Sequence, residues 1–345
     1  MTARAPSAER PPDQWRAAVI GCGWIGAGVA DDPRAAGIQA HAAAYDRCAD
    51  TVLGGVCDVD GGRAAEAAHR WGLKRGFTSV AELLASVRPQ IVSVCTPDAT
   101  HAAIIAEVLA SPDVRAVVAE KPLAQELAQA RALVELAGRR GVTLAVNYTR
   151  RFAASHADVR RRIAAGEIGA VVALNGLYTK GVLHNGTHWF DLARWLVGEI
   201  VSVQAWPGAV GSGNADPTCH VRMSFRHGQS GFLLGLDEGA FTVFEMDCIG
   251  TAGRLRFTDA GMRLSWSVVG DSPYYSGYRT LLARPETAGG FSDATLHLIE
   301  DVVAALRNGT RPLCTGEDAL AALAVAEAAR RSLTSGAECQ VERVP

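Results

Sequence analysis

Short apolar runs alternate with longer Ala-rich stretches through the first 147 residues of the chain. The runs are rich in Val and Ile and lie at residues 17–21, 51–57, 91–96, 114–119 and 142–146. Runs of this length are typical of buried strands, and the stretches between them have the apolar period of helices. The alternation therefore predicts βαβ units and a parallel sheet over residues 16–147.

The pattern changes after residue 147. Helices are predicted at 155–165 and 187–196, and strands at 171–178, 220–225, 231–236, 242–249 and 254–257. Gly or Asp turns separate the later strands, which favours an antiparallel sheet. Two closing helices are predicted at 293–307 and 317–332. Residues 148–345 are therefore expected to form a second α/β domain.

The composition fits a chain of two domains, since 345 residues with 48% hydrophobic content can bury a sizeable core. The formal net charge of -2 gives no field that would gather nucleic acid or an anionic membrane surface. Residues 1–15 lack an apolar core, so we expect a flexible tail there, and no apolar stretch is long enough to span a bilayer. The eight cysteines are scattered without a C-x-x-C pair, which favours a reducing, cytoplasmic setting.

Three glycines, Gly21, Gly23 and Gly26, form a G-x-G-x-x-G motif directly after the first predicted strand. Backbone amides at the start of the following helix can then face a pyrophosphate, although a tight turn alone would also use glycines. Asp58 ends the second predicted strand, where its carboxylate would bind the adenosine ribose and repel a 2′-phosphate. No neighbouring strand-end arginine offers the alternative, so we predict NAD as the cofactor and NADP as the less favoured one.

The spacing of this motif has one irregularity. The stretch from Gly26 to Asp58 is longer than the separation of about 20 residues that the motif leads one to expect. Residues 31–37, with Asp-Asp-Pro and a Gly, look like an insertion that breaks the first helix.

Two further segments follow strands at the same edge of the predicted sheet. Thr96 and Pro97 end the third strand, where doubly wound sheets bind ligands, although a proline also ends strands because it lacks a donor. Lys121 follows the fourth strand. Its ammonium can hydrogen-bond a substrate oxygen and stabilise alkoxide character as hydride leaves the carbon. The alternative is a solvated lysine at a strand end.

A second polar cluster lies at residues 184–191. His184, His188 and Asp191 are spaced by four and three residues, so they could share one helix face. His188 could take the hydroxyl proton during oxidation, with Asp191 orienting it or capping the helix, whereas a structural role for the histidines is the alternative. The pair also suggests zinc, but the Glu of H-E-x-x-H and any further ligand cluster are missing, so no metal is predicted.

Taken in order, these motifs resemble those of the Gfo/Idh/MocA oxidoreductases, the family of glucose-fructose oxidoreductase and inositol dehydrogenases. The resemblance spans nearly the whole chain. Its landmarks are Gly21-x-Gly23-x-x-Gly26, Asp58, Thr96-Pro97 with His101, Glu120-Lys121-Pro122, Arg150-Arg151-Phe152, Gly186-x-His188-x-x-Asp191 and Gly316-Glu317-Asp318-Ala319. Each motif is modest alone, but the order is specific.

The resemblance implies an N-terminal Rossmann domain, which is a doubly wound parallel sheet. It also implies a C-terminal α/β domain with a large open, mainly antiparallel sheet, whose exposed face forms homodimers or homotetramers. It implies that Lys121 and His188 flank the substrate carbon that faces the nicotinamide, with His184 as a third catalytic candidate. The expected cofactor contacts are Gly21, Gly23, Trp24, Ile25, Gly26, Asp58, Thr96, Pro97, His101, Glu120 and Lys121. The expected substrate contacts are Arg151, Lys180, His184, Asn185 and Asp191.

Two departures from the family pattern stand out. Many polyol dehydrogenases of the family carry an Asp four residues before the motif histidine, where this chain has His184. His184 could hydrogen-bond the substrate or relay a proton to His188, but it cannot supply a negative charge beside Lys121. Some family members with nucleotide-sugar substrates vary at this position, which tilts the expectation towards a sugar rather than free inositol. The second departure is the insertion, after which His41 takes the place of a histidine that usually follows the glycine loop closely.

The function expected from these residues is an NAD(P)-dependent oxidoreductase that interconverts a secondary alcohol and a ketone on a sugar, nucleotide-sugar or cyclitol. One alternative is a non-catalytic sensor that keeps the dinucleotide fold. Another is an oxidoreductase that holds its cofactor tightly and recycles it between two substrates.

Overall fold

The computed structural model describes residues 14–28, 37–208 and 216–344, and the chain divides into two compact units. The first unit comprises Met1–Glu120, Glu135–Ala145 and Thr295–Pro312, and the second comprises Lys121–Val134, Val146–Ala294 and Leu313–Pro345. Most of the predicted tail lies outside the described residues, but Trp15 already belongs to the first strand. The first unit therefore includes a late segment, residues 295–312, that the sequence pattern assigns to the second half.

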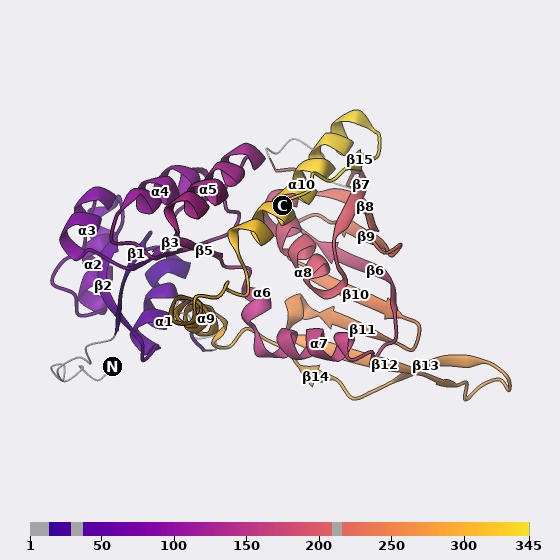
Figure 1. The fold of residues 1–345 in the computed structure, drawn as a ribbon. Coiled ribbons are helices and arrows are strands. Elements are labelled where there is room, and N and C mark those ends of the chain that lie inside the picture. The colour runs from indigo at the N-terminus through magenta and orange to yellow at the C-terminus, as the bar shows by residue number, and fades with distance from the viewer. Residues whose placement is uncertain (1–13, 29–36, 209–215, 345) are drawn as a thin grey trace. The chain divides into compact units, whose positions relative to one another are not determined.

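The first unit contains a parallel five-stranded sheet in the order β2-β1-β3-β4-β5 (Figure 1). Its strands are β1 (Trp15–Ile20), β2 (Thr51–Cys57), β3 (Ile91–Val94), β4 (Ala116–Ala119) and β5 (Thr143–Val146). Its helices are α1 (His41–Arg47), α2 (Gly61–Arg70), α3 (Val80–Val87), α4 (Asp98–Ala110), part of α5 (Leu127–Arg140) and nearly all of α9 (Ala294–Asn308). The predicted Rossmann sheet is confirmed.

The central strands of this sheet are buried on both faces, which explains why they are continuous apolar runs. Every residue of β3 and β4 is buried. From β1 the sheet extends to β2 on one side and to β3 on the other, so the chain reverses its winding at β1. Ligands of such sheets bind beyond the carboxyl ends of the strands at this reversal, which here are the ends of β1 and β3.

The motif glycines follow β1 and enter a short π-helical turn, Trp24–Gly28. Residues 29–36, which hold most of the predicted insertion, lie outside the described residues. Residues 37–40 are not helical, and α1 begins at His41. The turn and α1 are thus separate elements, as the interruption in the sequence pattern predicts.

The second unit is built on a ten-stranded sheet with the path β13-β12-β11-β10-β6-β9-β8-β7-β15, and β14 pairs with β12. Neighbouring strands are antiparallel except for β6 and β9, which are parallel. The strands are β6 (Val171–Tyr178), β7 (Ile200–Pro207), β8 (Cys219–Phe225), β9 (Ser230–Gly235), β10 (Phe244–Gly250), β11 (Gly253–Thr258), β12 (Arg263–Asp271), β13 (Arg279–Ala283), β14 (Thr287–Ala288) and β15 (Cys339–Gln340). The mainly antiparallel sheet is confirmed.

Five strands of this sheet, β7, β12, β13, β14 and β15, have no counterpart among the predicted segments. β13 and β14 consist almost entirely of exposed residues, so they carry little of the apolar alternation that marks a strand. β14 and β15 are two residues long. Their pairing is decided by neighbouring strands rather than by their own composition.

One face of this sheet packs on helices, and the other does not. Residues alternate along β6, β8, β9, β10 and β11, so every second side chain enters a core that includes Trp189 and Phe190 of α8 (Thr187–Val197) and Val325 of α10 (Gly316–Ser335). Figure 1 shows α8, α10 and α7 (Ala154–Ala164) along this side of the sheet. The opposite face exposes Phe232 and Leu234.

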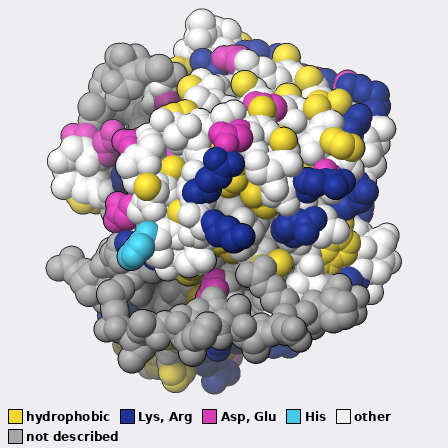
Figure 2. Space-filling model, turned by 90° about the vertical axis from the view of Figure 1, so that its left-hand side faces the viewer, with side chains coloured by type: hydrophobic (Ala, Val, Ile, Leu, Met, Phe, Trp, Pro, Cys, Tyr) yellow, Lys and Arg dark blue, Asp and Glu magenta, His cyan; other side chains and the backbone are white. Residues whose placement is uncertain are grey.

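The surface carries charges of both signs. Figure 2 shows a face on which Lys and Arg side chains form several groups, with acidic and hydrophobic side chains between them. This mixture agrees with the small net charge of the chain. In the part of the chain that the structure describes, helices long and apolar enough to cross a membrane are absent.

Candidate active site

The glycine loop of the first unit is shaped by backbone contacts that leave no room for side chains at two positions. Gly21 has a φ of 94°, and a Cβ there would lie 2.5 Å from the Cys95 carbonyl oxygen at the end of β3. A Cβ on Gly26 would lie 1.9 Å from the Gly21 carbonyl oxygen. Gly23 differs, because a Cβ there would meet no protein atom within 4 Å. The loop therefore packs tightly on itself and presents open space at Gly23, as a pyrophosphate cradle requires.

The other predicted cofactor contacts of this unit lie on the same loop or at the end of β3. Trp24 is 57% exposed and Ile25 is half-buried in the π-helical turn. Thr96 and Pro97 follow β3 directly. His101 is fully buried in α4, and its Nε2 lies 2.7 Å from the Thr96 carbonyl oxygen. His101 thus supports the turn at Thr96 from inside the protein rather than from the ligand side.

Asp58 follows β2 and is tied to three donors. Its carboxylate accepts hydrogen bonds from the Cys22 amide at 2.8 Å and the Asp60 amide at 2.9 Å. The Arg63 guanidinium donates at 2.9 and 3.2 Å. Burial alone would raise the pKa of Asp58, but these bonds outweigh it and hold the pKa below its ordinary value.

Among the described residues no arginine lies at a neighbouring strand end, as the sequence indicates, but Arg63 reaches Asp58 from a helix. Arg63 lies in the first turn of α2, and Asp60 caps this helix by accepting from two backbone amides. The start of the helix therefore places the Arg63 guanidinium near the end of β2. The Arg63 side chain is 55% exposed. A positive group therefore stands beside the Asp58 carboxylate.

In the second unit the Lys121 ammonium lies against the ring of His184. Nζ is 3.3 Å from Nδ1, 3.4 Å from Nε2 and 3.4 Å from the His184 carbonyl oxygen. The peptide bond between Lys121 and Pro122 is cis. An ammonium can only donate, so the imidazole that faces it must offer a lone pair. The geometry brings together two of the three predicted catalytic residues.

His188 is the third predicted catalytic residue and lies in the first turn of α8. Burial holds its pKa well below the ordinary range, and the charge of Lys121 acts in the same direction. Its Nδ1 is buried and has no hydrogen-bond partner among the described residues. The Tyr148 ring meets the imidazole edge-on, with centroids 5.4 Å apart. The His188 imidazole is therefore uncharged at ordinary pH, and it packs against the Tyr148 ring.

Arg150, from the landmark segment 150–152, contributes a second positive charge that disfavours protonation of His188. Its guanidinium lies over the Phe244 ring at 3.5 Å, and burial lowers its pKa to about 9. Sequence reasoning did not single out Tyr148 or Arg150 as neighbours of His188. They reach it from α6 (Thr149–Phe152) and the residue before it, some forty positions earlier in the chain.

The loop that carries His184 is fixed from a distant segment. The Asp216 carboxylate accepts hydrogen bonds from the backbone amides of Leu183 at 2.8 Å and His184 at 2.9 Å. Gly181 has a φ of 76°, and a Cβ there would lie 2.0 Å from an Asp216 oxygen. The loop is a π-helical turn, Gly181–Gly186, so Asp216 sets the backbone beside Lys121. Asp216 was not predicted, because no local motif links it to residues 183–184.

Two other predicted substrate contacts lie in this turn. Lys180 directly precedes the turn, with a φ of 66° and an exposed side chain. Asn185 is half-buried, and its backbone amide donates to the Lys180 carbonyl at 3.4 Å. Both side chains thus belong to the same turn as His184.

Arg151 and Asp191 are placed differently from the expectation. The Arg151 guanidinium donates to both oxygens of Asp191 at 2.9 and 2.7 Å, and it also bonds Asp318 at 3.2 Å. The side chains of Arg151 and Asp191 are 5% and 1% exposed. Asp191 thus pairs with Arg151 rather than with His188. Because buried charges must be paired, each side chain of this pair stabilises the charge of the other.

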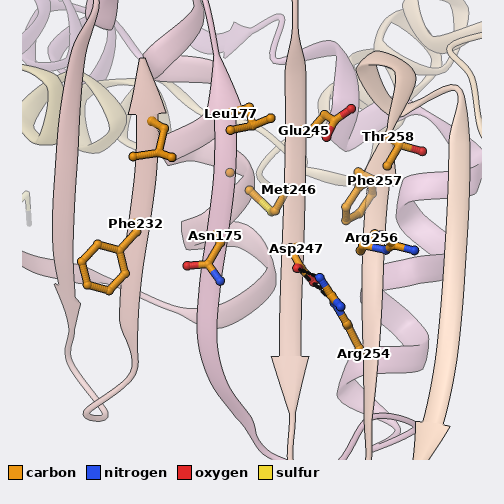
Figure 3. Close-up of a pocket in the computed structure, with 12 residues that line it drawn as sticks. Asn175, Leu177, Phe232, Glu245, Met246, Asp247, Arg254, Arg256, Phe257 and Thr258 are labelled. Carbon is orange, nitrogen blue, oxygen red and sulfur yellow. Dashed lines mark hydrogen bonds and ion pairs between the residues drawn. The ribbon is translucent and has the colours of Figure 1, made fainter. Parts of the chain in front are cut away.

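A separate hollow of about 450 Å³ lies on the open face of the second unit's sheet (Figure 3). Its lining residues are Asn175, Gly176, Leu177, Phe232, Leu234, Glu245, Met246, Asp247, Arg254, Arg256, Phe257 and Thr258. An ion pair between Asp247 and Arg254 crosses from β10 to β11. The predicted site residues are not among this lining, so the hollow is distinct from the Lys121 cluster. In the described ranges, clusters of three or more side chains suited to hold a metal ion are absent.

Comparison with known proteins links both halves of the chain to one family. Myo-inositol 2-dehydrogenase of Thermotoga maritima is 25% identical over 95% of this chain and 99% of its own length. D-apiose dehydrogenase of Paraburkholderia graminis is 24% identical over 94% of this chain and 88% of its own length. A solved structure of levoglucosan dehydrogenase with NADH and L-sorbose has a TM-score of 0.80 at 18% identity, and covers 96% of this chain and 100% of that one.

The structural likeness shows the fold, and the sequence profiles show the family. The profile of the oxidoreductase family's NAD-binding Rossmann domain matches residues 15–148. The profile of the family's C-terminal α/β domain matches residues 175–342. The chain therefore belongs to the Gfo/Idh/MocA oxidoreductase family.

Proposed function

We propose that the protein is an NAD-dependent dehydrogenase or ketone reductase that interconverts a secondary alcohol and a ketone on a sugar, nucleotide-sugar or cyclitol. The observation that carries this proposal is the Lys121 ammonium beside His184, with the neutral base His188 in the same unit. The relatives described above are named for myo-inositol and D-apiose, which supports a polyol substrate.

The roles of the chain's own residues follow from their charge. Lys121 donates a hydrogen bond to the substrate oxygen and stabilises negative charge on it, while the neutral His188 accepts the hydroxyl proton. Bound NAD supplies the nicotinamide that takes up hydride from the same carbon. His184 accepts from Lys121 and so orients the ammonium, and Lys180 and Asn185 contact the substrate from the same turn. In the reverse direction the protonated His188 returns the proton to the alkoxide.

The cofactor is proposed to be NAD, because the Asp58 carboxylate is available to the ribose hydroxyls and opposes a 2′-phosphate. Arg63 moderates this preference, since its exposed guanidinium partly neutralises Asp58. Titration of Arg63→Ala and wild type with NADH and NADPH tests the point. We expect NADPH binding to weaken more than NADH binding in the variant. An equal change for both cofactors would contradict the role of Arg63.

The protein is further proposed to form a homodimer or homotetramer through the open face of the second sheet. Phe232 and Leu234 are 43% and 42% exposed there, and the face combines apolar side chains with the Asp247–Arg254 pair. Light scattering of Phe232→Glu should give a smaller species than wild type. A cytoplasmic location is proposed because all eight cysteines are free thiols.

The activity test is NADH formation with NAD, and separately with NADP, against a panel of inositols, free sugars and nucleotide-sugars. Turnover that depends on Lys121 supports the proposal and names the substrate class. NADH binding without turnover on any member would favour a sensor. Cofactor that stays bound through gel filtration would favour an enzyme that recycles it between two substrates.

A further inference from the structure

A chain of buried polar side chains crosses the interior of the first unit and ends at the residue before Lys121. Its members, each bonded to the next, are Tyr45, Ser93, His41 and Glu120. The Tyr45 hydroxyl lies 2.7 Å from Ser93 Oγ, which lies 2.8 Å from His41 Nδ1. His41 Nε2 lies 3.0 Å from a Glu120 carboxylate oxygen. The first three residues are completely buried, whereas the Glu120 side chain is 12% exposed.

One direction of hydrogen bonding satisfies all four groups. Burial raises the pKa of Tyr45, so its hydroxyl keeps its proton and donates to Ser93. The Ser93 hydroxyl then donates to His41 Nδ1, and His41 Nε2–H donates to the Glu120 carboxylate, which only accepts when ionised. The opposite order would direct a lone pair of His41 at the carboxylate. In this direction of hydrogen bonding His41 carries its proton on Nε2 and accepts at Nδ1.

The position of Ser93 argues that this arrangement has a purpose beyond packing. It lies inside β3, whose other residues are apolar and buried, so burying its hydroxyl costs free energy unless it is bonded. The series of hydrogen-bonded side chains runs from Ser93 to Glu120. The backbone amide of Glu120 donates to the carbonyl of Val94 at the end of β3. Glu120 thus stands at the strand edge where the glycine loop also lies, and its carboxylate is the one member that reaches solvent.

We propose that Tyr45, Ser93 and His41 are positioning residues that hold the Glu120 carboxylate for the bound cofactor. The inference deepens the proposed function and rests on it. His41 contacts Glu120 directly, and the two hydroxyls act through His41 by fixing its tautomer and ring orientation. Because Lys121 is the next residue, the same hydrogen bonds also fix the residue at which the segment with the proposed catalytic ammonium begins.

The first test measures NADH binding by the purified full-length protein in a fluorescence titration. Ser93→Ala and His41→Leu should each raise the NADH dissociation constant about tenfold, since each removes a bond that orders a charged group. His41→Gln should recover most of the affinity, because its amide both donates and accepts. Thr51→Val is the matched control. It removes a buried hydroxyl that bonds the Tyr45 carbonyl at 2.7 Å without entering the chain.

Melting temperatures separate positioning from folding. A structural role alone predicts that Thr51→Val and Ser93→Ala lose similar stability and similar affinity. Positioning predicts that only Ser93→Ala loses affinity. Unchanged NADH binding in both Ser93→Ala and His41→Leu, alongside normal binding by wild type, would overturn the proposal. Should His41→Leu fail to fold, Tyr45→Phe, with an expected loss of about threefold, replaces it.

The tautomer gives a readout that does not need the cofactor. Side-chain ¹⁵N spectra of wild type, with His41 assigned by its loss in His41→Gln, should show the Nε2–H form. Detection of the Nδ1–H form or of a doubly protonated ring would contradict the proposed order of bonds. If wild type binds no NADH at all, the proposed function fails. The tautomer of His41 still decides whether the hydrogen bonds from Tyr45 to Glu120 form in the proposed order.

Discussion

The glycine loop of the first unit and the histidine loop of the second are built in opposite ways. At Gly21 and Gly26 the backbone approaches itself so closely that an added Cβ would collide with carbonyl oxygens. The histidine loop comprises the turn Gly181–Gly186 and the first turn of α8, which holds His188. Its backbone is held by the Asp216 carboxylate, and its proposed reacting groups are side chains. The glycine loop depends on the absence of side chains, and the histidine loop depends on the protonation states of its side chains.

This difference determines how each site should fail. The glycine loop should lose cofactor affinity when atoms are added, with little sensitivity to pH. The histidine loop should lose turnover when a proton acceptor is removed, with cofactor affinity retained. Separate measurement of NADH binding and of kcat can therefore distinguish the two sites.

The largest effect is expected from His188→Asn, which removes the base. We expect kcat to fall about 10²- to 10⁴-fold, because general base catalysis typically contributes this much. NADH affinity should stay within about twofold of wild type. Steady-state kinetics and a binding titration on the same preparation check both statements.

The matched control for this variant is His156→Gln, at a buried histidine of the same unit. It packs against Phe257 and Phe291 with ring centroids 5.0 and 5.3 Å away. Its kcat should remain near wild type. A loss of NADH affinity in His188→Asn equal to the loss of kcat would remove the distinction between the sites.

The next effect concerns two glycines of the same motif. Gly23→Ala should weaken NADH binding about tenfold or more while the melting temperature stays unchanged, because the new Cβ meets only open space in the free protein. Gly26→Ala should weaken binding and also lower the melting temperature, since its Cβ would lie 1.9 Å from a carbonyl oxygen. Calorimetry with and without NADH separates the two. Equal destabilisation by both variants would show that Gly23 is also a packing position.

An intermediate effect is expected on acid stability. Burial lowers the pKa of His156 from 6.5 to about 3, with the charge of Arg150 acting in the same direction. Between these values the unfolded chain binds a proton that the folded protein does not, so the free energy of unfolding falls as pH falls. His156 contributes up to about 1.4 kcal/mol per pH unit in this window. Urea unfolding of His156→Gln should show a shallower loss between pH 6 and 4, within about that amount, and a parallel curve would contradict the assignment.

The smallest effect is expected from Asp216→Asn. The amide oxygen can still accept one of the two backbone hydrogen bonds, so we expect kcat to fall only about fivefold and NADH affinity to be unchanged. Asp216→Ala removes both acceptors and should lower kcat further. An alanine variant with wild-type kcat would show that the turn holds His184 without help from Asp216.

Much of the fold can be predicted from the sequence because its strands are buried. β1 to β5 are apolar runs, and β6, β8, β9, β10 and β11 alternate, so each produces a recognisable period. β7, β12 and the short strands are missed because exposed or polar residues interrupt the period. The parallel pairing of β6 with β9 also has no local signal, since α8, β7 and β8 lie between them in the sequence.

The residues of the candidate site also divide into those that a local sequence pattern predicts and those that it does not. The glycine loop is predictable because three glycines at fixed spacing serve one local turn, and Lys121 is predictable because it ends a strand. Arg63 and Asp216 are missed because each reaches its partner through a helix start or a remote segment. Arg151 and Asp191 are recognised by their motifs, but the sequence cannot show that they pair with each other instead of with a ligand.

The return of α9 to the first unit bears on how the protein is made. Thr295 donates to the Gln39 carbonyl at 2.8 Å, and Arg307 forms two bonds of 2.7 Å with Asp50. A ribosome must therefore synthesise more than three hundred residues before the first unit has all its parts. Until then the nascent Rossmann sheet lacks one of its helices, and a fragment that ends after β5 would lack it permanently. Completion of the nucleotide-binding unit is thus coupled to translation of nearly the entire second unit.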